Sequence, residues 1–131
     1  MQFKIGDKAT TTKAFSAQDV EQFAELSGDK NPIHLDEAYS ATTIFKHRIV
    51  HGSLVSSLIS SVLGNQLPGP GSIYMGQTLS FKRPVYLNDA ITCTVEIFEI
   101  NPDKKVYKLN TICTNAKGDV VVEGVAVIKH D

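Results

Sequence analysis

Cysteine is scarce in this sequence: only Cys93 and Cys113 occur among its 131 residues. They do not form a Cys-x-x-Cys pair and have no second pair of metal ligands, so neither a disulfide framework nor a zinc site is predicted. The first residues also lack the apolar stretch of a signal peptide, because Lys4, Asp7 and Lys8 interrupt them. We therefore expect a protein of the reducing cytoplasm.

An excess of charge of either sign is also missing. The formal net charge is −1, from 13 lysines and arginines against 14 aspartates and glutamates, and no basic block is longer than a pair. Nucleic-acid binding requires a strong positive field that neutralises phosphates, so nucleic acid is excluded as a main partner. The most apolar segment, residues 49–67, is interrupted by His51, Asn65 and five serines. This pattern favours a buried helix over a membrane span.

Internal repeats and long Pro/Gly/Ser tracts are absent too. Without them the chain has no visible linker that would separate two domains. Hydrophobic residues make up 42% and charged residues 21%, which is an ordinary composition for a folded soluble protein. The length is that of one domain, so we expect a single domain over residues 1–131.

The first half of the sequence carries helix signals. A short Thr-rich strand is expected over residues 10–15. Ser16 and Asp19 are then spaced as a capping box for a helix that Gly28 ends. A polar segment follows, and a brief helical stretch is expected over residues 36–42.

A longer helix is predicted within residues 49–67, where apolar residues advance at helical spacing and serines occupy the other side. The breaker cluster at residues 67–71 stops this helix. The apolar residues are Leu54, Val55, Leu58, Ile59, Val62 and Leu63, and the serines are Ser53, Ser56, Ser57, Ser60 and Ser61.

The second half changes to a period of two, which is typical of strands. Strands are expected over residues 72–81, 91–97, 106–114 and 120–128, with a hairpin connection at residues 115–119. Helices followed by consecutive strands indicate an α+β protein with an antiparallel sheet. We place the long apolar helix in the curve of that sheet, because it is the only element long enough to cover the apolar face.

The segment from Asp29 to His34 is the strongest candidate for chemistry. It lies just past a helix end in a turn shaped by Gly28 and Pro32, where a carboxylate and an imidazole five residues apart can converge. Such a pair can hold a water molecule, remove its proton and deliver a proton elsewhere. The alternative is structural: Asp29 caps the following turn and His34 is a core histidine bonded to a carbonyl.

Gly52, which follows His51, is the second candidate. It is expected at the start of the long helix, where first-turn amides lack intrahelical acceptors and can polarise a substrate carbonyl oxygen. A glycine that only allows close helix packing is the alternative.

Other polar residues rank lower. The serines of the long helix lack the strand and nucleophile elbow of a serine hydrolase. His47 and Arg48 are expected in a loop, and for Lys82 and Arg83 a solvated edge is favoured over a phosphate contact.

Five segments together resemble the MaoC-like hydratases, specifically the short (R)-specific enoyl-CoA hydratases that feed polyhydroxyalkanoate synthesis. The resemblance covers most of the chain from about residue 17 onward. Its most specific part is the pairing of Asp-x-Asn-Pro-x-His with a downstream His-Gly. The segments that carry it are residues 23–34, 49–52, 63–69, 71–74 and 80–85.

The resemblance implies a hot-dog fold, in which a curved antiparallel sheet wraps one long helix, and a homodimer with a continuous sheet. By position it implies that Asp29 and His34 are the catalytic pair and that Asn31 supports the site. It also implies that the Gly52 amide receives the thioester oxygen and that Ser60 and Leu63 line the acyl pocket.

The implied reaction is reversible addition of water to a trans-2-enoyl-CoA, which gives an (R)-3-hydroxyacyl-CoA. No cofactor or metal is expected, because CoA is part of the substrate. An acyl-carrier-protein dehydratase, a hot-dog acyl-CoA thioesterase and a non-catalytic acyl-CoA sensor are the alternatives. The residues do not decide which member of the pair is the base, or which acyl chain length is preferred.

Overall fold

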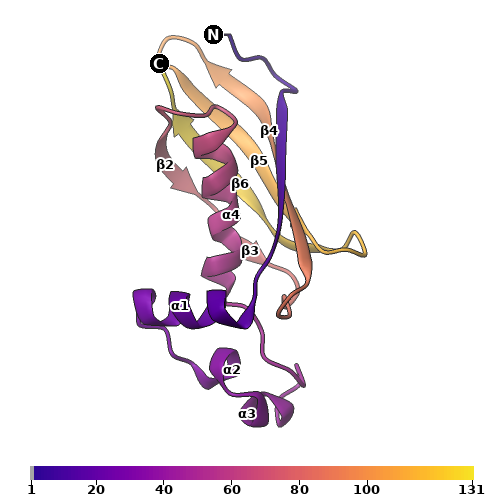
Figure 1. Ribbon diagram of the computed structural model, residues 1–131. Coiled ribbons are helices and arrows are strands. Elements are labelled where there is room, and N and C mark those ends of the chain that lie inside the picture. Colours follow the sequence, from indigo (N-terminus) through magenta and orange to yellow (C-terminus); the bar gives the residue numbers. More distant parts are fainter. Residues whose placement is uncertain (1) are drawn as a thin grey trace.

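The computed structural model describes residues 2–131, in which one strand and the helices come first and the other strands follow (Figure 1). In chain order they are β1 (Lys8–Ala14), α1 (Ala17–Ser27), α2 (Pro32–Leu35), α3 (Glu37–Ala41), α4 (Gly52–Asn65), β2 (Ile73–Gln77), β3 (Ser80–Phe81), β4 (Ala90–Asn101), β5 (Val106–Thr114) and β6 (Val120–Lys129).

The strands form one antiparallel sheet in the order β1-β4-β5-β6-β2, and the short β3 also pairs with β6. Helix α4 runs along one face of this curved sheet, while α1, α2 and α3 gather beyond its N-terminal end (Figure 1). The hot-dog arrangement and the α+β class are therefore confirmed. The topology leaves β1 and β2 as the two edges of the sheet.

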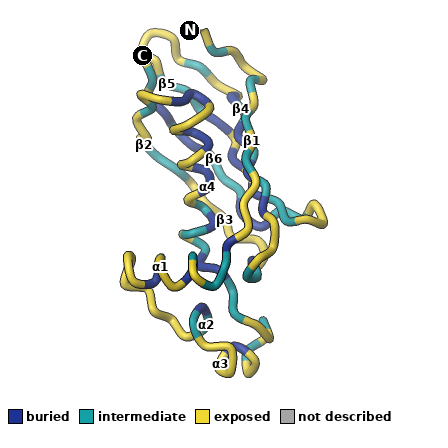
Figure 2. Tube along the Cα trace, in the orientation of Figure 1, coloured by how far each residue is buried: buried dark blue, intermediate teal, exposed yellow. Residues whose placement is uncertain are grey.

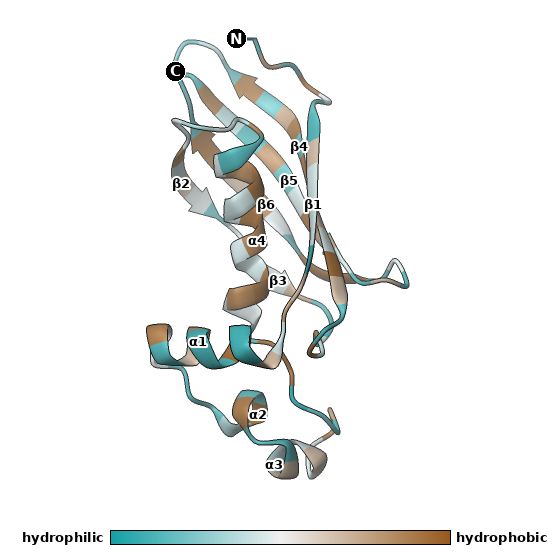
Figure 3. Ribbon diagram, viewed as in Figure 1, coloured by the Kyte–Doolittle hydropathy of each residue, from teal (hydrophilic) through white to brown (hydrophobic). Residues whose placement is uncertain are grey.

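The core lies between α4 and the sheet, as the periodicity of both predicts. The stripe of α4 that includes Ile59 and Val62 is fully buried, and its serines lie on the outer side. Along β4 buried residues alternate with partly exposed ones, so one face of the strand packs on the helix. Burying each such aliphatic side chain contributes roughly 1.5–3 kcal/mol. Figures 2 and 3 show the buried and hydrophobic residues of α4 and the sheet.

Helix α1 begins and ends where the sequence predicts. The Asp19 amide donates to Ser16 Oγ and the Ser16 amide donates to Asp19 Oδ2, which is a complete capping box. Gly28 ends the helix with a left-handed φ of 81°, a conformation that costs glycine little. These two caps determine where the following turn leaves the helix.

The expected single strand over residues 72–81 is wrong, because β2 and β3 are separate. At the break, the Thr78 amide donates to the Val125 carbonyl, and Thr78 Oγ1 accepts from the Val125 amide at 2.9 Å. A side-chain oxygen thus takes the place of a backbone carbonyl and interrupts the regular ladder. Gly124 allows the close approach, since a Cβ there would lie 1.8 Å from the Thr78 carbonyl oxygen.

Smaller differences occur in the first half. The first strand covers Lys8–Ala14 instead of residues 10–15, and Phe15 turns into the core. The helical stretch expected over residues 36–42 is α3, but the one-turn helix α2 before it was not expected. None of the helices within residues 2–131 combines the length and the apolar character needed to cross a bilayer.

Candidate active site

The turn between α1 and α2 brings Asp29 and His34 together. Asp29 Oδ1 accepts from the Asn31 amide at 3.3 Å, and Asn31 Oδ1 accepts from the Ile33 amide at 3.2 Å and so caps α2. Proline at the first helical position suits this start, because its missing N–H would have no helical acceptor. These consecutive local turns place His34, on α2, close to Asp29.

His34 is held in one tautomer by the backbone. Its Nδ1 lies 2.8 Å from the carbonyl oxygen of Ile49, and a carbonyl only accepts, so Nδ1 donates. In the neutral ring the lone pair is then on Nε2. The side chain is buried, and because Nδ1 is bonded to the Ile49 carbonyl, Nε2 is the ring atom that can take up a proton.

His51 is the third polar residue of this cluster. Its Nε2 donates to the backbone carbonyl of Asp29 at 2.9 Å, and its ring stacks on that of His34 with centroids 3.8 Å apart and planes 25° apart. A carboxylate oxygen of Asp29 and one ring nitrogen each of His34 and His51 lie within 4.8 Å of one another. His34 Nδ1 and His51 Nε2 are each bonded to a backbone carbonyl, which leaves one unbonded nitrogen on each ring.

Burial is the main cause that lowers the pKa of His34 below its ordinary value of 6.5. The neighbouring His51 acts in the same direction, whereas the hydrogen bond to Ile49 and the Asp29 carboxylate oppose it. His34 is therefore neutral near pH 7, and its Nε2 can accept a proton.

Residues 29–34 are clamped to residues 49–52 by hydrogen bonds far apart in sequence. The Ile49 amide donates to the Ile33 carbonyl at 3.2 Å, in addition to the bonds made by the two histidine rings. Arg48 Nε donates to the His34 carbonyl at 2.7 Å and its guanidinium lies 3.5 Å from Glu21. The clamp aligns the turn with the start of α4.

Gly52 is the first residue of α4, as predicted. The first bonds of the helix run from the amides of Leu54 and Val55 to the His51 carbonyl. Within residues 2–131 the Gly52 amide therefore has no hydrogen-bond acceptor. An oxygen placed there would meet both an N–H group and the positive end of the helix dipole.

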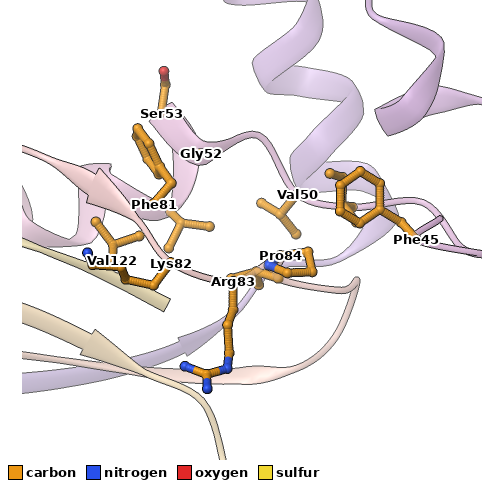
Figure 4. A pocket seen from close by; sticks show the side chains of 12 residues that line it. Phe45, Val50, Gly52, Ser53, Phe81, Lys82, Arg83, Pro84 and Val122 are labelled. Carbon is orange, nitrogen blue, oxygen red and sulfur yellow. The ribbon is translucent and has the colours of Figure 1, made fainter. Parts of the chain in front are cut away.

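A cavity of about 500 Å³ opens at this helix start. The ring of Phe81 lies against Gly52, where an added Cβ would come within 2.7 Å of it (Figure 4). Lys82 and Arg83, expected at a solvated edge, are exposed and also line the cavity. The remaining lining residues are Phe45, Ile49, Val50, Ser53, Val55, Pro84, Val85 and Val122.

Ser60 and Leu63 do not line this cavity. Ser60 is exposed and lines a separate open groove of about 360 Å³ together with Tyr74, Met75 and other residues. Leu63 is 1% exposed and packs in the core. The protomer thus brings Asp29, His34 and Gly52 into one region but leaves the two expected acyl-pocket residues farther along α4.

His51 is the site residue whose contacts sequence reasoning missed. Its position directly before Gly52 was visible, but nothing local to it predicts a bond to a carbonyl 22 residues earlier. The signal was only the concentration of histidines and aspartates in one part of the chain.

Comparison with known proteins identifies the family. The family described as MaoC like domain matches residues 2–122. The chain belongs to the MaoC-like family. It is 49% identical over 126 residues to an (R)-specific enoyl-CoA hydratase of Aeromonas caviae, covering 96% of this chain and 94% of the relative. It is 36% identical over 121 residues to a mitochondrial 3-hydroxyacyl-[acyl-carrier-protein] dehydratase of Arabidopsis thaliana, covering 91% and 72% respectively.

Solved structures of MaoC-like proteins superpose closely. The structure of an (R)-hydratase from A. caviae involved in PHA biosynthesis matches with a TM-score of 0.96 and 48% identity, covering 98% of both chains. An R-hydratase from Pseudomonas aeruginosa matches with a TM-score of 0.93 and 45% identity, covering 98% of this chain and 84% of its own.

The lowered pKa of His34 predicts how stability depends on pH. Between its folded and unfolded pKa values the unfolded chain binds more protons. The contribution of His34 is therefore complete above about pH 6.5 and is lost as the pH falls through the folded-state pKa. We expect the free energy of unfolding in urea to drop less between about pH 7.5 and 5.5 in His34→Gln than in the parent.

Asn110→Gln is the control, because Asn110 is an exposed side chain on β5 and its substitution leaves every titratable group in place. This control should lose as much stability as the parent over the same interval. An equal loss in His34→Gln and the parent would contradict the assignment.

Proposed function

We propose that the protein is an (R)-specific enoyl-CoA hydratase. It adds water reversibly to a trans-2-enoyl-CoA, placing OH on Cβ and H on Cα, to give an (R)-3-hydroxyacyl-CoA. The observation that carries the proposal is the cluster in which the His34 ring, bonded through Nδ1 to a backbone carbonyl, lies beside the Asp29 carboxylate and is joined through His51 to the Gly52 amide, which has no hydrogen-bond partner within residues 2–131. Relatives with nearly half of their residues identical carry the same activity in their names.

His34 and Asp29 act on the water in this proposal. His34 Nε2 has the free lone pair, so it accepts the proton as the oxygen attacks Cβ, and the Asp29 carboxylate orients the water. The pair then returns a proton to Cα, which balances the reaction. Asn31 supports the site indirectly, since it caps α2 and bonds to Asp29.

Gly52 stabilises the charge that develops. As Cβ is attacked, negative charge accumulates on the thioester oxygen, and a preorganised amide donor at the helix start lowers the energy of that state. We assign the cavity beside Gly52 to the thioester and its CoA arm, with Lys82 and Arg83 near the phosphates. Ser60 and Leu63 remain our proposal for the distal acyl pocket. No separate cofactor or metal is proposed.

We propose that the protein acts as a homodimer through β2. This edge strand and the segment after it expose apolar side chains, with Ile73 and Met75 each 57% exposed and Leu79 39% exposed. A second copy pairing with this edge would continue the sheet and cover the groove beside Ser60.

We place the activity in the cytoplasm, where the buried free thiols of Cys93 and Cys113 stay reduced. Polyhydroxyalkanoate synthesis is the use that we propose for the product, since the A. caviae structure is described as a hydratase involved in that biosynthesis.

Asp29→Asn and His34→Gln test the catalytic pair. Each variant should lower kcat for crotonyl-CoA hydration by about 10²–10⁴-fold, because each removes an acid–base group without removing volume. Loss of the enoyl absorbance measures the rate, and chiral chromatography should show the (R) product. Parent rates in both folded variants would contradict the assigned pair.

The same assay separates the alternatives. Free thiol without a 3-hydroxyacyl product would indicate a thioesterase, and binding without turnover would indicate a sensor. Preference for a crotonyl-acyl-carrier-protein over crotonyl-CoA would indicate a dehydratase like the plant relative.

Met75→Lys tests the dimer. A charge on the exposed β2 edge should convert a dimeric parent to monomers, because pairing would bury an unpartnered ammonium group. Light scattering coupled to size-exclusion chromatography measures the mass. Ile5→Lys, at a residue 66% exposed outside β2, should stay dimeric, and a monomeric parent would contradict the proposal.

A further inference from the structure

His51 makes contacts that its place in the chain does not require. It is the N-cap of α4, yet its side chain makes no capping hydrogen bond to the helix. The ring instead turns back to the preceding turn, donates to the Asp29 carbonyl and stacks on His34. The ring of Phe23 on α1 also packs against the His51 ring, with centroids 4.9 Å apart.

The hydrogen bond to the Asp29 carbonyl selects the tautomer of the His51 ring that carries its proton on Nε2. His51 is 1% exposed, and within residues 2–131 its Nδ1 has no hydrogen-bond partner. Because Nε2 carries the proton, the unpartnered Nδ1 holds a lone pair that no donor satisfies. A buried polar atom without a partner is unfavourable, so this arrangement needs a compensating role.

We propose that His51 is a positioning residue for the hydration reaction, holding the Asp29 carbonyl and the His34 ring at a set distance from the Gly52 amide. This inference rests on the proposed function. The same residue touches both members of the proton-transfer pair and is covalently joined to the residue that receives the thioester oxygen. His51 therefore couples the water-activating half of the site to the carbonyl-polarising half.

This role has a kinetic signature. His51 does not line the cavity that we assign to the CoA arm or the groove that we assign to the acyl chain, so substrate affinity should change little. The rate should fall, because a misplacement of about 1 Å between reacting groups costs about 10²-fold. A residue that only stabilises the fold would instead lower the fraction of active protein and leave kcat per folded molecule unchanged.

Two substitutions separate the contacts of His51. His51→Phe keeps a stacked ring but loses the donor to Asp29, and His51→Gln keeps an amide donor but loses the ring. We expect His51→Phe to lower kcat about 10²-fold with KM within about threefold of the parent. His51→Gln should recover about tenfold of that loss, since the donor to Asp29 returns. His47→Phe and His47→Gln are the matched controls and should keep parent kinetics.

Parent kcat in folded His51→Phe, or a change in KM alone, would overturn the proposal. A readout without any substitution is the ¹⁵N spectrum of the histidine rings in the parent, which distinguishes the tautomers. It should show His51 protonated on Nε2 and His34 on Nδ1, and a reversed tautomer of His51 would also overturn the proposal. If the parent fails to hydrate enoyl-CoA while the tautomers are as expected, the proposed function is wrong, although the contacts of the His51 ring are as described.

Discussion

The hydrogen bonds between residues 29–34 and residues 49–52 are the constraint on which the site depends. They join the turn after α1, with the α2 residues that follow it, to the start of α4, and the chain between these two segments consists of α3 and a loop. Each of the two histidine bonds ends on a backbone carbonyl, so the tautomers follow from main-chain geometry. Without these bonds, the turn that carries Asp29 and His34 would not be fixed relative to the amide at the start of α4.

The hot-dog fold gives this clamp a rigid support. Helix α4 is packed on the sheet along its apolar stripe, so the position of its first amide is determined by the core. Burial by the surrounding segments lowers the pKa of His34 and keeps a proton acceptor available at neutral pH. One packing arrangement thus determines where the site lies and which protonation state it has.

The sequence predicts the parts of this structure that rest on local patterns. The capping box at Ser16, the apolar stripe of α4 and the alternation in β4 are each periodic or capping signals, and each is confirmed. The break at Thr78 and the contact of His51 with Asp29 were not predictable in this way. Both depend on which distant backbone lies opposite, and no local spacing encodes that.

Asp29 and His34 were selected because a turn that contains Gly28 and Pro32 lets a carboxylate and an imidazole converge. The structure adds the tautomer and the pKa direction of His34, from which we propose His34 as the base. The most direct test of the account is a crystal structure with bound (R)-3-hydroxybutyryl-CoA. It should show the 3-hydroxyl within hydrogen-bond distance of the Asp29 carboxylate and His34 Nε2, and the thioester oxygen on the Gly52 amide. An ordered acyl group with its hydroxyl or its thioester oxygen elsewhere would contradict it.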